Sequence, residues 1–369
     1  MDTGYSVELL VQAYFDCRRL KRNTDSALAF EQGLERNLLS LHEELTSGSY
    51  RPGRSICFVI TRPRPREVWA ADFRDRIVHH LLYNQIADRF HRRFIADSCA
   101  CIPGRGTLYA GQRLEAKIRS QTQNWTHDAF YLKCDLANFF VSIDKRVLWP
   151  LLAKRIPGRW WRMLAKLVLF HDPRTDVEVR GERALLRLVP PHKRLMEAPR
   201  HHGLPIGNLS SQFFANILLN ELDQHVKHTI RARHYIRYVD DFVILHQSAV
   251  WLNNAHDQIN DFLPSLGLAI NPRKTILQPV ARGVDFAGHV IKPHRRQARR
   301  RTVHTGLARI ERLPASDTLA TINSYLGLLR HTDGHRDRGR VANAARKRGH
   351  CVDGALTKAY RRGIHMENA

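Results

Sequence analysis

The sequence predicts an α+β fold, in which short apolar strands and amphipathic helices follow one another along the chain. Two kinds of observation predict it. Residues 235–245 form two apolar runs on either side of a tight acidic turn, which is typical of a buried hairpin. Residues 73–90 and 214–226 instead carry apolar side chains at helical spacing. A chain of 369 residues can bury a large core and favours two or three domains.

The N-terminal part of the chain predicts a helix, a strand and a second helix. Residues 28–47 are expected to form one amphipathic helix, which Gly48 ends. Residues 54–61 are then predicted to form a strand. In the run 62–66 arginine alternates with proline, which excludes a helix there. Such a basic loop between a strand and a helix can contact a triphosphate, and a solvated turn explains it equally well.

Two later segments place a single charged residue at a turn. Arg105 lies between two glycines and can approach a phosphate closely, although residues 101–107 lack the Gly-Lys-Ser/Thr ending of a Walker loop and an ordinary turn explains them nearly as well. Residues 130–135 predict a strand that ends on Asp135. A lone Asp at such a place is usually a helix cap or turn residue, so only other acidic residues nearby make it a candidate ligand.

Residues 171–202 are rich in Arg, Pro and His and have no regular period, so we expect a long surface excursion. The excursion leads into a turn with two glycines and a proline at residues 203–212, directly before the 214–226 helix. This turn predicts a stiff ledge that suits a flat partner such as a base pair.

The acidic turn of the predicted hairpin holds Asp240 and Asp241 side by side. Two adjacent carboxylates repel each other and resist burial unless a cation neutralises them. The pair therefore indicates either a metal site or an exposed surface turn. Tyr238 before the turn and the apolar run after it favour the metal site, because they place the turn on a core hairpin.

The charge of the chain favours a polyanionic partner, nucleic acid before a membrane surface. Lys and Arg outnumber Asp and Glu by 59 to 35, which gives a net charge of +24. From residue 292 onward there are 18 Lys or Arg and 6 Asp or Glu, so this segment carries +12, half of the total. Contacts to phosphates would gain from such an excess. Apolar residues at helical spacing between 319 and 329 predict that this basic segment is folded.

The six cysteines contain no Cys-x-x-Cys pair, and we expect reduced, buried thiols. No signal peptide opens the sequence, and no apolar run approaches the ~18 residues that a membrane span needs. We therefore expect a soluble cytoplasmic protein with no membrane partner.

Taken in order, these segments resemble the motifs of reverse transcriptases. The resemblance covers roughly residues 50–291 and rests on Asp135 with Phe139 and Phe140, the 203–212 ledge, the run from Tyr238 to Asp241, the turn at 271–275, and the hairpin with Phe286 and Gly288. Within that family the chain looks most like the enzymes of diversity-generating retroelements. Retroviral and group II intron enzymes usually have Pro-Gln-Gly where this chain has Pro205-Ile-Gly207, and they lack the glutamine found here at 212.

The resemblance implies a right-hand polymerase fold with fingers, a palm whose antiparallel sheet packs on helices, and a helical thumb. The implied division is a helical N-terminal extension at 1–50, fingers and palm at 51–291, and a basic helical thumb at 292–369. The implied activity is RNA-directed DNA polymerase: copying of a template RNA into cDNA from a primer and dNTPs. The retroelement type further implies errors at template adenines and a small basic accessory protein.

The resemblance also implies roles for single residues. Two Mg²⁺ ions, for which Mn²⁺ can substitute, would be held by Asp135, Asp240, Asp241 and the backbone carbonyl of Leu136. Lys274 would protonate the leaving pyrophosphate, and Phe140 would exclude a ribose 2′-hydroxyl. The implied substrate-binding residues are Arg64, Arg66, Arg105, Phe140, Ile206, Gly207, Gln212 and Tyr238.

Two alternatives stay open at this point. A retron-like or phage-defence reverse transcriptase would share the same motifs. A catalytically silent RNA-binding scaffold would keep the palm for its shape, although the intact acidic residues argue against it.

Overall fold

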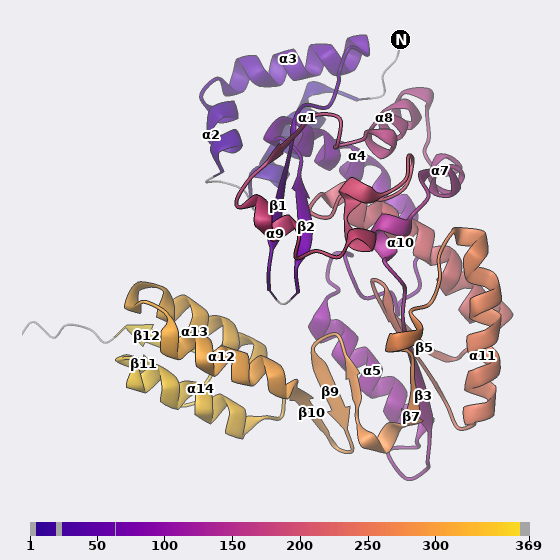
Figure 1. The fold of residues 1–369 in the computed structure, drawn as a ribbon, viewed down its shortest axis with the longest axis vertical. Helices are drawn as coiled ribbons and strands as arrows, with labels where there is room; N and C mark the ends of the chain where they lie inside the picture. Colours follow the sequence, from indigo (N-terminus) through magenta and orange to yellow (C-terminus); the bar gives the residue numbers. More distant parts are fainter. Residues whose placement is uncertain (1–4, 20–23, 63, 362–369) are drawn as a thin grey trace, which may run out of the picture. The chain divides into compact units, whose positions relative to one another are not determined.

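The computed structural model describes residues 5–19, 24–62 and 64–361 (Figure 1). Its described residues divide into two compact units. Unit 1 comprises Met1–Cys101, Asp135–Arg231 and Asp257–Arg273, and unit 2 comprises Ile102–Cys134, Ala232–His256 and Lys274–Ala369. Both units combine helices with strands, so the predicted α+β class is confirmed. The division at 1–50, 51–291 and 292–369 stays a prediction.

Unit 1 contains one small sheet and most of the helices that the structure describes. They are α1 (Val7–Arg18), α2 (Asp25–Glu31), α3 (Leu34–Ser47), α4 (Phe73–His91), α6 (Phe139–Ser142), α7 (Lys145–Ala153), α8 (Arg159–Phe170), α9 (Arg183–Leu186) and α10 (Leu209–Gln224). The prediction of one helix over 28–47 is wrong, because the chain forms α2 and α3 with Gly33 as the N-cap of α3. Glycine is a poor helix former, which explains the break. Gly48 does end α3, with a left-handed φ of 78°.

The sheet of unit 1 has the strand order β2-β1-β4. Strand β1 (Ser55–Ile60) pairs antiparallel with β2 (Arg66–Ala70) and parallel with β4 (Val177–Val179). The 171–202 segment is therefore more than the predicted surface excursion. Besides β4 it supplies Leu195, which is buried against Cys57 and Trp69. Within the predicted basic turn at 62–66, Pro63 lies outside the described residues.

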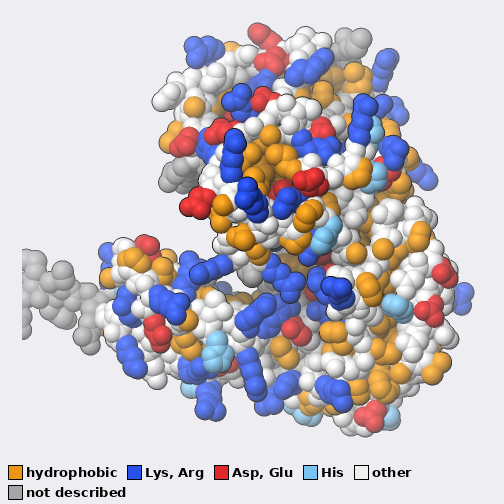
Figure 2. Space-filling view, in the orientation of Figure 1, with side chains coloured by type: hydrophobic (Ala, Val, Ile, Leu, Met, Phe, Trp, Pro, Cys, Tyr) orange, Lys and Arg blue, Asp and Glu red, His pale blue; other side chains and the backbone are white. Residues whose placement is uncertain are grey.

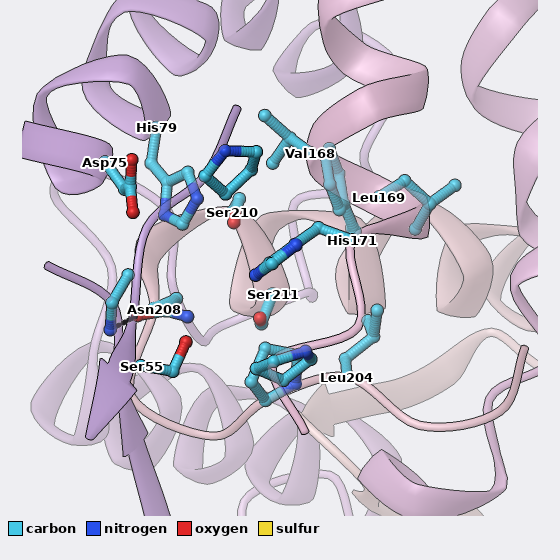
Figure 3. A pocket seen from close by; sticks show the side chains of 15 residues that line it. Ser55, Asp75, His79, Val168, Leu169, His171, Leu204, Asn208, Ser210 and Ser211 are labelled. Atoms are coloured by element: carbon cyan, nitrogen blue, oxygen red, sulfur yellow. Dashed lines mark hydrogen bonds between the residues drawn. The ribbon is translucent and has the colours of Figure 1, made fainter. Parts of the chain in front are cut away.

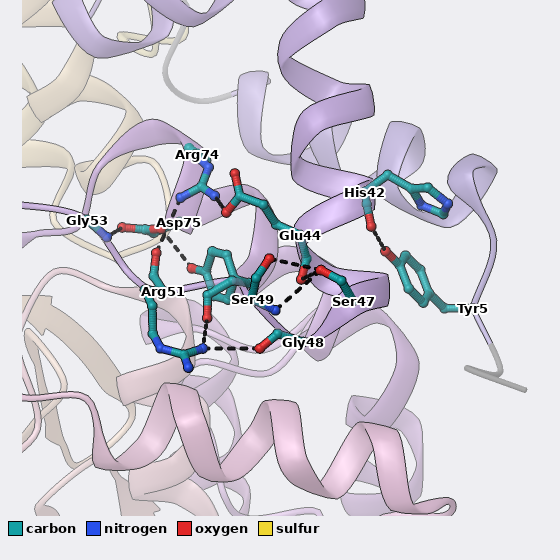
Figure 4. Close-up of polar contacts among 11 residues, drawn as sticks. Tyr5, His42, Glu44, Ser47, Gly48, Ser49, Arg51, Gly53, Arg74 and Asp75 are labelled. Carbon is teal, nitrogen blue, oxygen red and sulfur yellow. Dashed lines mark hydrogen bonds and ion pairs between the residues drawn. The ribbon is translucent and has the colours of Figure 1, made fainter. Parts of the chain in front are cut away.

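Polar contacts fix the start of α4 to the segment before β1 (Figure 4). The buried carboxylate of Asp75 accepts hydrogen bonds from the Tyr50 hydroxyl at 2.7 Å and from the Gly53 amide at 2.8 Å. Burial raises the pKa of Asp75 and that of Tyr50, so each supplies the polar partner that the other needs. Arg74 pairs with Glu44 of α3, which joins the two helices.

Unit 2 contains a four-stranded sheet with the order β5-β6-β3-β7. Its strands are β3 (Phe130–Asp135), β5 (His234–Tyr238), β6 (Asp241–His246) and β7 (Ile276–Pro279). Strands β5 and β6 pair antiparallel, and their apolar side chains are buried, so the predicted hairpin at 235–245 is confirmed. Helix α5 (Thr107–Gln121) belongs to the same unit, while α11 (Ala249–Phe262) spans residues of both.

The C-terminal part of unit 2 is folded, as the apolar spacing between 319 and 329 predicts. A second sheet, β10-β9-β8, consists of β8 (Val284–Phe286), β9 (His289–Lys292) and β10 (Arg295–Ala298). The helices α12 (Arg300–Arg312), α13 (Ala315–Leu329) and α14 (His335–Lys347) then share a core around Ile310, Ile322 and Val341. The chain ends in the hairpin of β11 (His350–Val352) and β12 (Ala359–Arg361). Lys and Arg side chains gather over these helices (Figure 2).

The cysteines correct a further prediction. Four of the thiols are buried, but Cys101 and Cys351 are exposed, because each lies on a surface turn or a short edge strand. Within the residues that the structure describes, no helix combines the length and apolar character needed to cross a lipid bilayer.

Candidate active site

The acidic turn between β5 and β6 is a tight one. Tyr238 pairs with Asp241 across the turn, and Val239 has a φ of +55°. A left-handed conformation is strained for a β-branched residue, so the surroundings must hold it. Arg237 helps to do so: its side chain is 1% exposed and donates a hydrogen bond to the Val239 carbonyl at 3.0 Å. Asp240 and Asp241 remain partly exposed, so solvent and a cation can reach them.

Lys133 of strand β3 contacts the acidic turn directly. Its Nζ forms an ion pair with Oδ2 of Asp241 at 3.3 Å and donates a hydrogen bond, at 2.9 Å, to the carbonyl of Asp285. The strand order places β3 next to β6, which explains the contact. Sequence reasoning missed both Lys133 and Arg237. The available signal was a lysine or arginine inside each of two largely apolar strands, β3 and β5, that end at or just before an acidic residue of the predicted site.

Asp135 is the last residue of β3 and is partly exposed. Its backbone carbonyl accepts a hydrogen bond from the Asn271 amide at 2.8 Å, and the next residue, Leu136, forms a bridge with Ile270. These backbone contacts fix the end of strand β3 and the backbone of Leu136 that follows it.

The carboxylates have the donor chemistry of a site for a hard divalent cation. Asp240 and Asp241 are adjacent oxygen donors, and Asp241 already attracts an ammonium group. In the described part of the chain, however, no group of three or more His, Cys, Asp or Glu side chains is placed to hold a metal ion. The ligand set of Asp135, Leu136, Asp240 and Asp241 thus stays a prediction.

The predicted ledge at 203–212 is pinned to strand β2 through its backbone. The Trp69 amide donates a hydrogen bond to the Ile206 carbonyl at 2.7 Å, and the Ala71 amide donates one to Oδ1 of Asn208 at 3.2 Å. Gly207 has a φ of +127°, and a Cβ built on it would lie 2.6 Å from the Trp69 carbonyl oxygen. Only glycine fits this close approach without a shift.

Phe140 lies next to the ledge. Its carbonyl accepts a hydrogen bond from the Leu204 amide at 2.8 Å, and its partly exposed ring makes an edge contact with Phe139, with ring centroids 5.3 Å apart. The structure therefore brings together two predicted site elements that lie more than sixty residues apart in the sequence.

Residues 61–291 match the family model described as reverse transcriptase (RNA-dependent DNA polymerase). The match spans more than half of the chain and includes Asp135, the ledge and the acidic hairpin. The chain belongs to the reverse transcriptase family. The right-hand polymerase fold class predicted for it is thereby confirmed.

Two solved structures resemble this chain at low identity. One is telomerase from Candida albicans in complex with a TWJ fragment of telomeric RNA, at 12% identity and a TM-score of 0.48, covering 79% of this chain and 56% of that chain. The other is apo telomerase from Candida tropicalis truncated from its C-terminal domain, at 12% identity and 0.47, covering 69% and 58%. The chain thus spans a little more than half the length of either telomerase chain. No curated protein matches it in sequence.

Next to the ledge lies a small cavity of about 20 Å³ with a mixed polar and apolar lining (Figure 3). Its polar lining residues include Asn208, Ser210 and Ser211 at the start of α10, together with His79 of α4 and His171. The Nδ1 atom of His79 is buried without a hydrogen-bond partner in the described residues, and burial lowers the pKa of His79 to about 3. A cavity of this size that offers polar partners can hold one water molecule.

The remaining predicted site residues are basic or polar. Arg64 and Arg66 are exposed at the start of β2, and Gln212 is exposed on α10. The Arg105 guanidinium lies over the Tyr109 ring, 5.8 Å from its centroid, directly before α5. Lys274 ends a short 3-10 turn, as predicted, and is partly exposed. Their proposed contacts to substrate stay predictions.

Proposed function

We propose that this protein is an RNA-directed DNA polymerase that copies a template RNA into cDNA from a primer and dNTPs. The observation that carries the proposal is the acidic hairpin, with Asp240 and Asp241 at a strained, partly exposed turn inside the region matched by the family model. Strain at such a turn is typical of functional sites.

In this proposal Asp135, Asp240, Asp241 and the Leu136 carbonyl would hold two Mg²⁺ ions, with Mn²⁺ as a substitute. The chemistry supplied by such ions is a more acidic primer 3′-hydroxyl and a neutralised triphosphate. Magnesium suits hard carboxylate oxygens. The partial exposure of the pair supports the proposal, because a divalent ion must enter from solvent.

The other roles belong to the protein's own side chains. The Phe140 ring would occupy the space of a 2′-hydroxyl, and Ile206, Gly207 and Gln212 would form the seat of the nascent base pair. Lys274 would donate a proton to pyrophosphate, a role that suits a mobile ammonium. Tyr238, Arg64, Arg66 and Arg105 would contact the primer terminus, the triphosphate or the template.

We further propose that the polymerase is the mutagenic enzyme of a diversity-generating retroelement, assisted by a small basic accessory protein. The support is the sequence of the ledge, with Ile206 before Gly207 and with Gln212, in place of the Pro-Gln-Gly form. The proposal predicts errors concentrated at template adenines. A retron-like or phage-defence enzyme would instead give few errors, or errors spread equally over the four bases.

A primer-extension assay with Mg²⁺ tests the polymerase activity. Asp240→Asn should abolish nucleotide addition and leave RNA binding and thermal stability nearly unchanged, because the carboxylate serves the metal site more than the core. Asp176→Asn is the matched control, since it removes an exposed carboxylate that pairs with Arg54 in unit 1. Extension by the Asp240 variant above a few per cent of the parent rate would contradict the assignment. A parent that binds RNA but never extends a primer would be the silent scaffold.

Sequencing of the cDNA tests the retroelement type. The template should present all four bases in balanced contexts. An excess of misinsertions opposite adenine that changes when Ile206 or Gln212 is replaced is expected. A parent that is accurate, or equally inaccurate at every base, would remove this assignment and leave the polymerase.

A further inference from the structure

We propose that Lys133 is a positioning residue that serves as the resident counter-charge of Asp241 and occupies the carboxylate until a divalent cation binds. The inference rests on the proposed function, since it assumes that Asp241 is a metal ligand. In this proposal the charge of Lys133 stabilises the metal-free protein and weakens the binding of a divalent cation.

The geometry holds the Lys133 ammonium at a fixed point. One contact is to Oδ2 of Asp241 at 3.3 Å, and the other is to the Asp285 carbonyl at 2.9 Å. The side chain of Lys133 is 14% exposed and that of Asp241 is 25% exposed, so water screens the pair only in part. An ammonium has three donors and no acceptor, and two of its donors are thus engaged by two different strands.

The carbonyl anchor is itself held firmly. Asp285 pairs with Val290 in the β8–β9 ladder, and its carboxylate accepts a hydrogen bond from Arg299 at 2.6 Å. Arg299 is the N-cap residue of α12. Lys133 therefore cannot follow Asp241 freely, because its other contact belongs to a paired and ion-paired strand. All of these residues lie in unit 2.

The electrostatic consequence has a definite sign. Before a metal binds, the ammonium offsets the repulsion between the adjacent carboxylates of Asp240 and Asp241. When a divalent cation approaches the same oxygen, the ammonium repels it and competes for the carboxylate. Removal of the charge should therefore destabilise the metal-free protein and tighten metal binding. If Lys133 had a merely structural role, its removal would lower both the stability of the metal-free protein and the affinity for the metal.

The test uses the full chain and Mn²⁺ alone, without nucleotide. Lys133→Met removes the charge, and Lys133→Gln removes it while its amide can still donate to the Asp285 carbonyl, which guards against a misfolded first variant. Lys133→Arg keeps the charge. Lys154→Met is the control, because it makes the same substitution at an exposed lysine of unit 1. Binding of Mn²⁺ is followed by electron paramagnetic resonance, and thermal unfolding is measured with EDTA and with saturating Mn²⁺.

We expect the Met and Gln variants to bind Mn²⁺ about tenfold more tightly than the parent, and the Arg variant and the control to match the parent. With EDTA the Met and Gln variants should unfold at a lower temperature than the parent. Saturating Mn²⁺ should reduce this difference in unfolding temperature between variant and parent. Unchanged or weaker Mn²⁺ binding in both charge-removing variants would overturn the proposal. Asp241→Asn separates it from the proposed function. If Mn²⁺ binding depends on Asp241 and ignores Lys133, only the counter-charge role fails. If Asp241→Asn leaves Mn²⁺ binding unchanged, both the metal-site assignment and the counter-charge role of Lys133 fail.

Discussion

Replacement of Gly207 by alanine should strongly destabilise the protein, because two separate constraints meet at this residue. Its φ of +127° lies in a region that L side chains rarely adopt. A Cβ there would also lie 2.6 Å from the Trp69 carbonyl oxygen and 3.1 Å from Cγ1 of Val68. The first of these is a backbone atom of a paired strand, so it cannot turn aside as a flexible side chain would.

The magnitude follows from the two constraints. A sparsely populated backbone conformation costs about 1–3 kcal/mol, and forcing an extra carbon into a packed site costs about 1–3 kcal/mol more. The free energy of unfolding should therefore fall by about 2–6 kcal/mol, against a typical total of about 5–15 kcal/mol for a domain. If the backbone shifts instead, the hydrogen bond between the Trp69 amide and the Ile206 carbonyl is lost, and the ledge moves with it.

Gly48→Ala provides the matched control. Gly48 also has a positive φ, of +78°, but a Cβ on it would meet nothing within 4 Å. The control should show the conformational cost alone, about 1–2 kcal/mol. Urea unfolding of the parent and both variants gives the free energies, and primer extension reports on the ledge. If Gly207→Ala unfolds like the parent, or no more readily than Gly48→Ala, the close approach to Trp69 is wrong.

Three further predictions concern Phe140 as the residue that excludes a ribose 2′-hydroxyl, the basic helix α12 and the buried histidines. Phe140→Ala should let the enzyme insert ribonucleotides, and unchanged discrimination between dNTP and rNTP in single-turnover extension would exclude the ring as the gate. Affinity for template–primer should fall by roughly 10³–10⁵ between 50 and 200 mM salt if ~6–10 phosphates are contacted. Arg300→Gln and Arg301→Gln on α12 should each reduce the steepness of log affinity against log salt concentration by about one. An unaltered slope would argue against phosphate contacts at these two residues. Burial lowers the pKa of His79 to about 3 and that of His289 to about 4, from the ordinary 6.5, with Arg296 and His331 adding to the effect at His289. Between these pKa values and 6.5 the unfolded chain binds more protons than the folded chain, so the free energy of unfolding should fall as the pH drops from 6.5 towards 4. A free energy of unfolding that does not change with pH over that window, or that changes as steeply in His289→Gln, would contradict the prediction.

The sequence predicts well those features whose signals are local. The acidic hairpin, the helix at 73–90 and the turn before α10 follow from apolar spacing and from turn residues within a few positions of one another. Their bounds in the structure are β5 and β6 at His234–Tyr238 and Asp241–His246, and α4 at Phe73–His91. The break between α2 and α3 was missed because leucine spacing continues past Gly33.

Features that depend on distant partners could not be predicted in the same way. The 171–202 segment has no periodicity of its own, yet β4 pairs with β1 and Leu195 packs on Trp69, more than a hundred residues away in sequence. Lys133 likewise contacts Asp241 and Asp285. A lysine in an apolar strand is unusual enough to mark the position, but only the strand order β6-β3 shows which carboxylate it meets.

The way in which the ledge is held decides how its variants can be interpreted. Its contacts to β2 use the Ile206 carbonyl, the Gly207 backbone and the Asn208 side chain. None of them uses the side chains of Ile206 or Gln212, and Gln212 is exposed. Substitutions at 206 and 212 should therefore change the surface offered to a base pair while the seat stays in place. Substitutions at 207 and 208 should move the seat itself and lower insertion of every nucleotide. A change in base selectivity without a loss of stability is thus expected only at 206 and 212, and this contrast separates an effect on fidelity from damage to the fold.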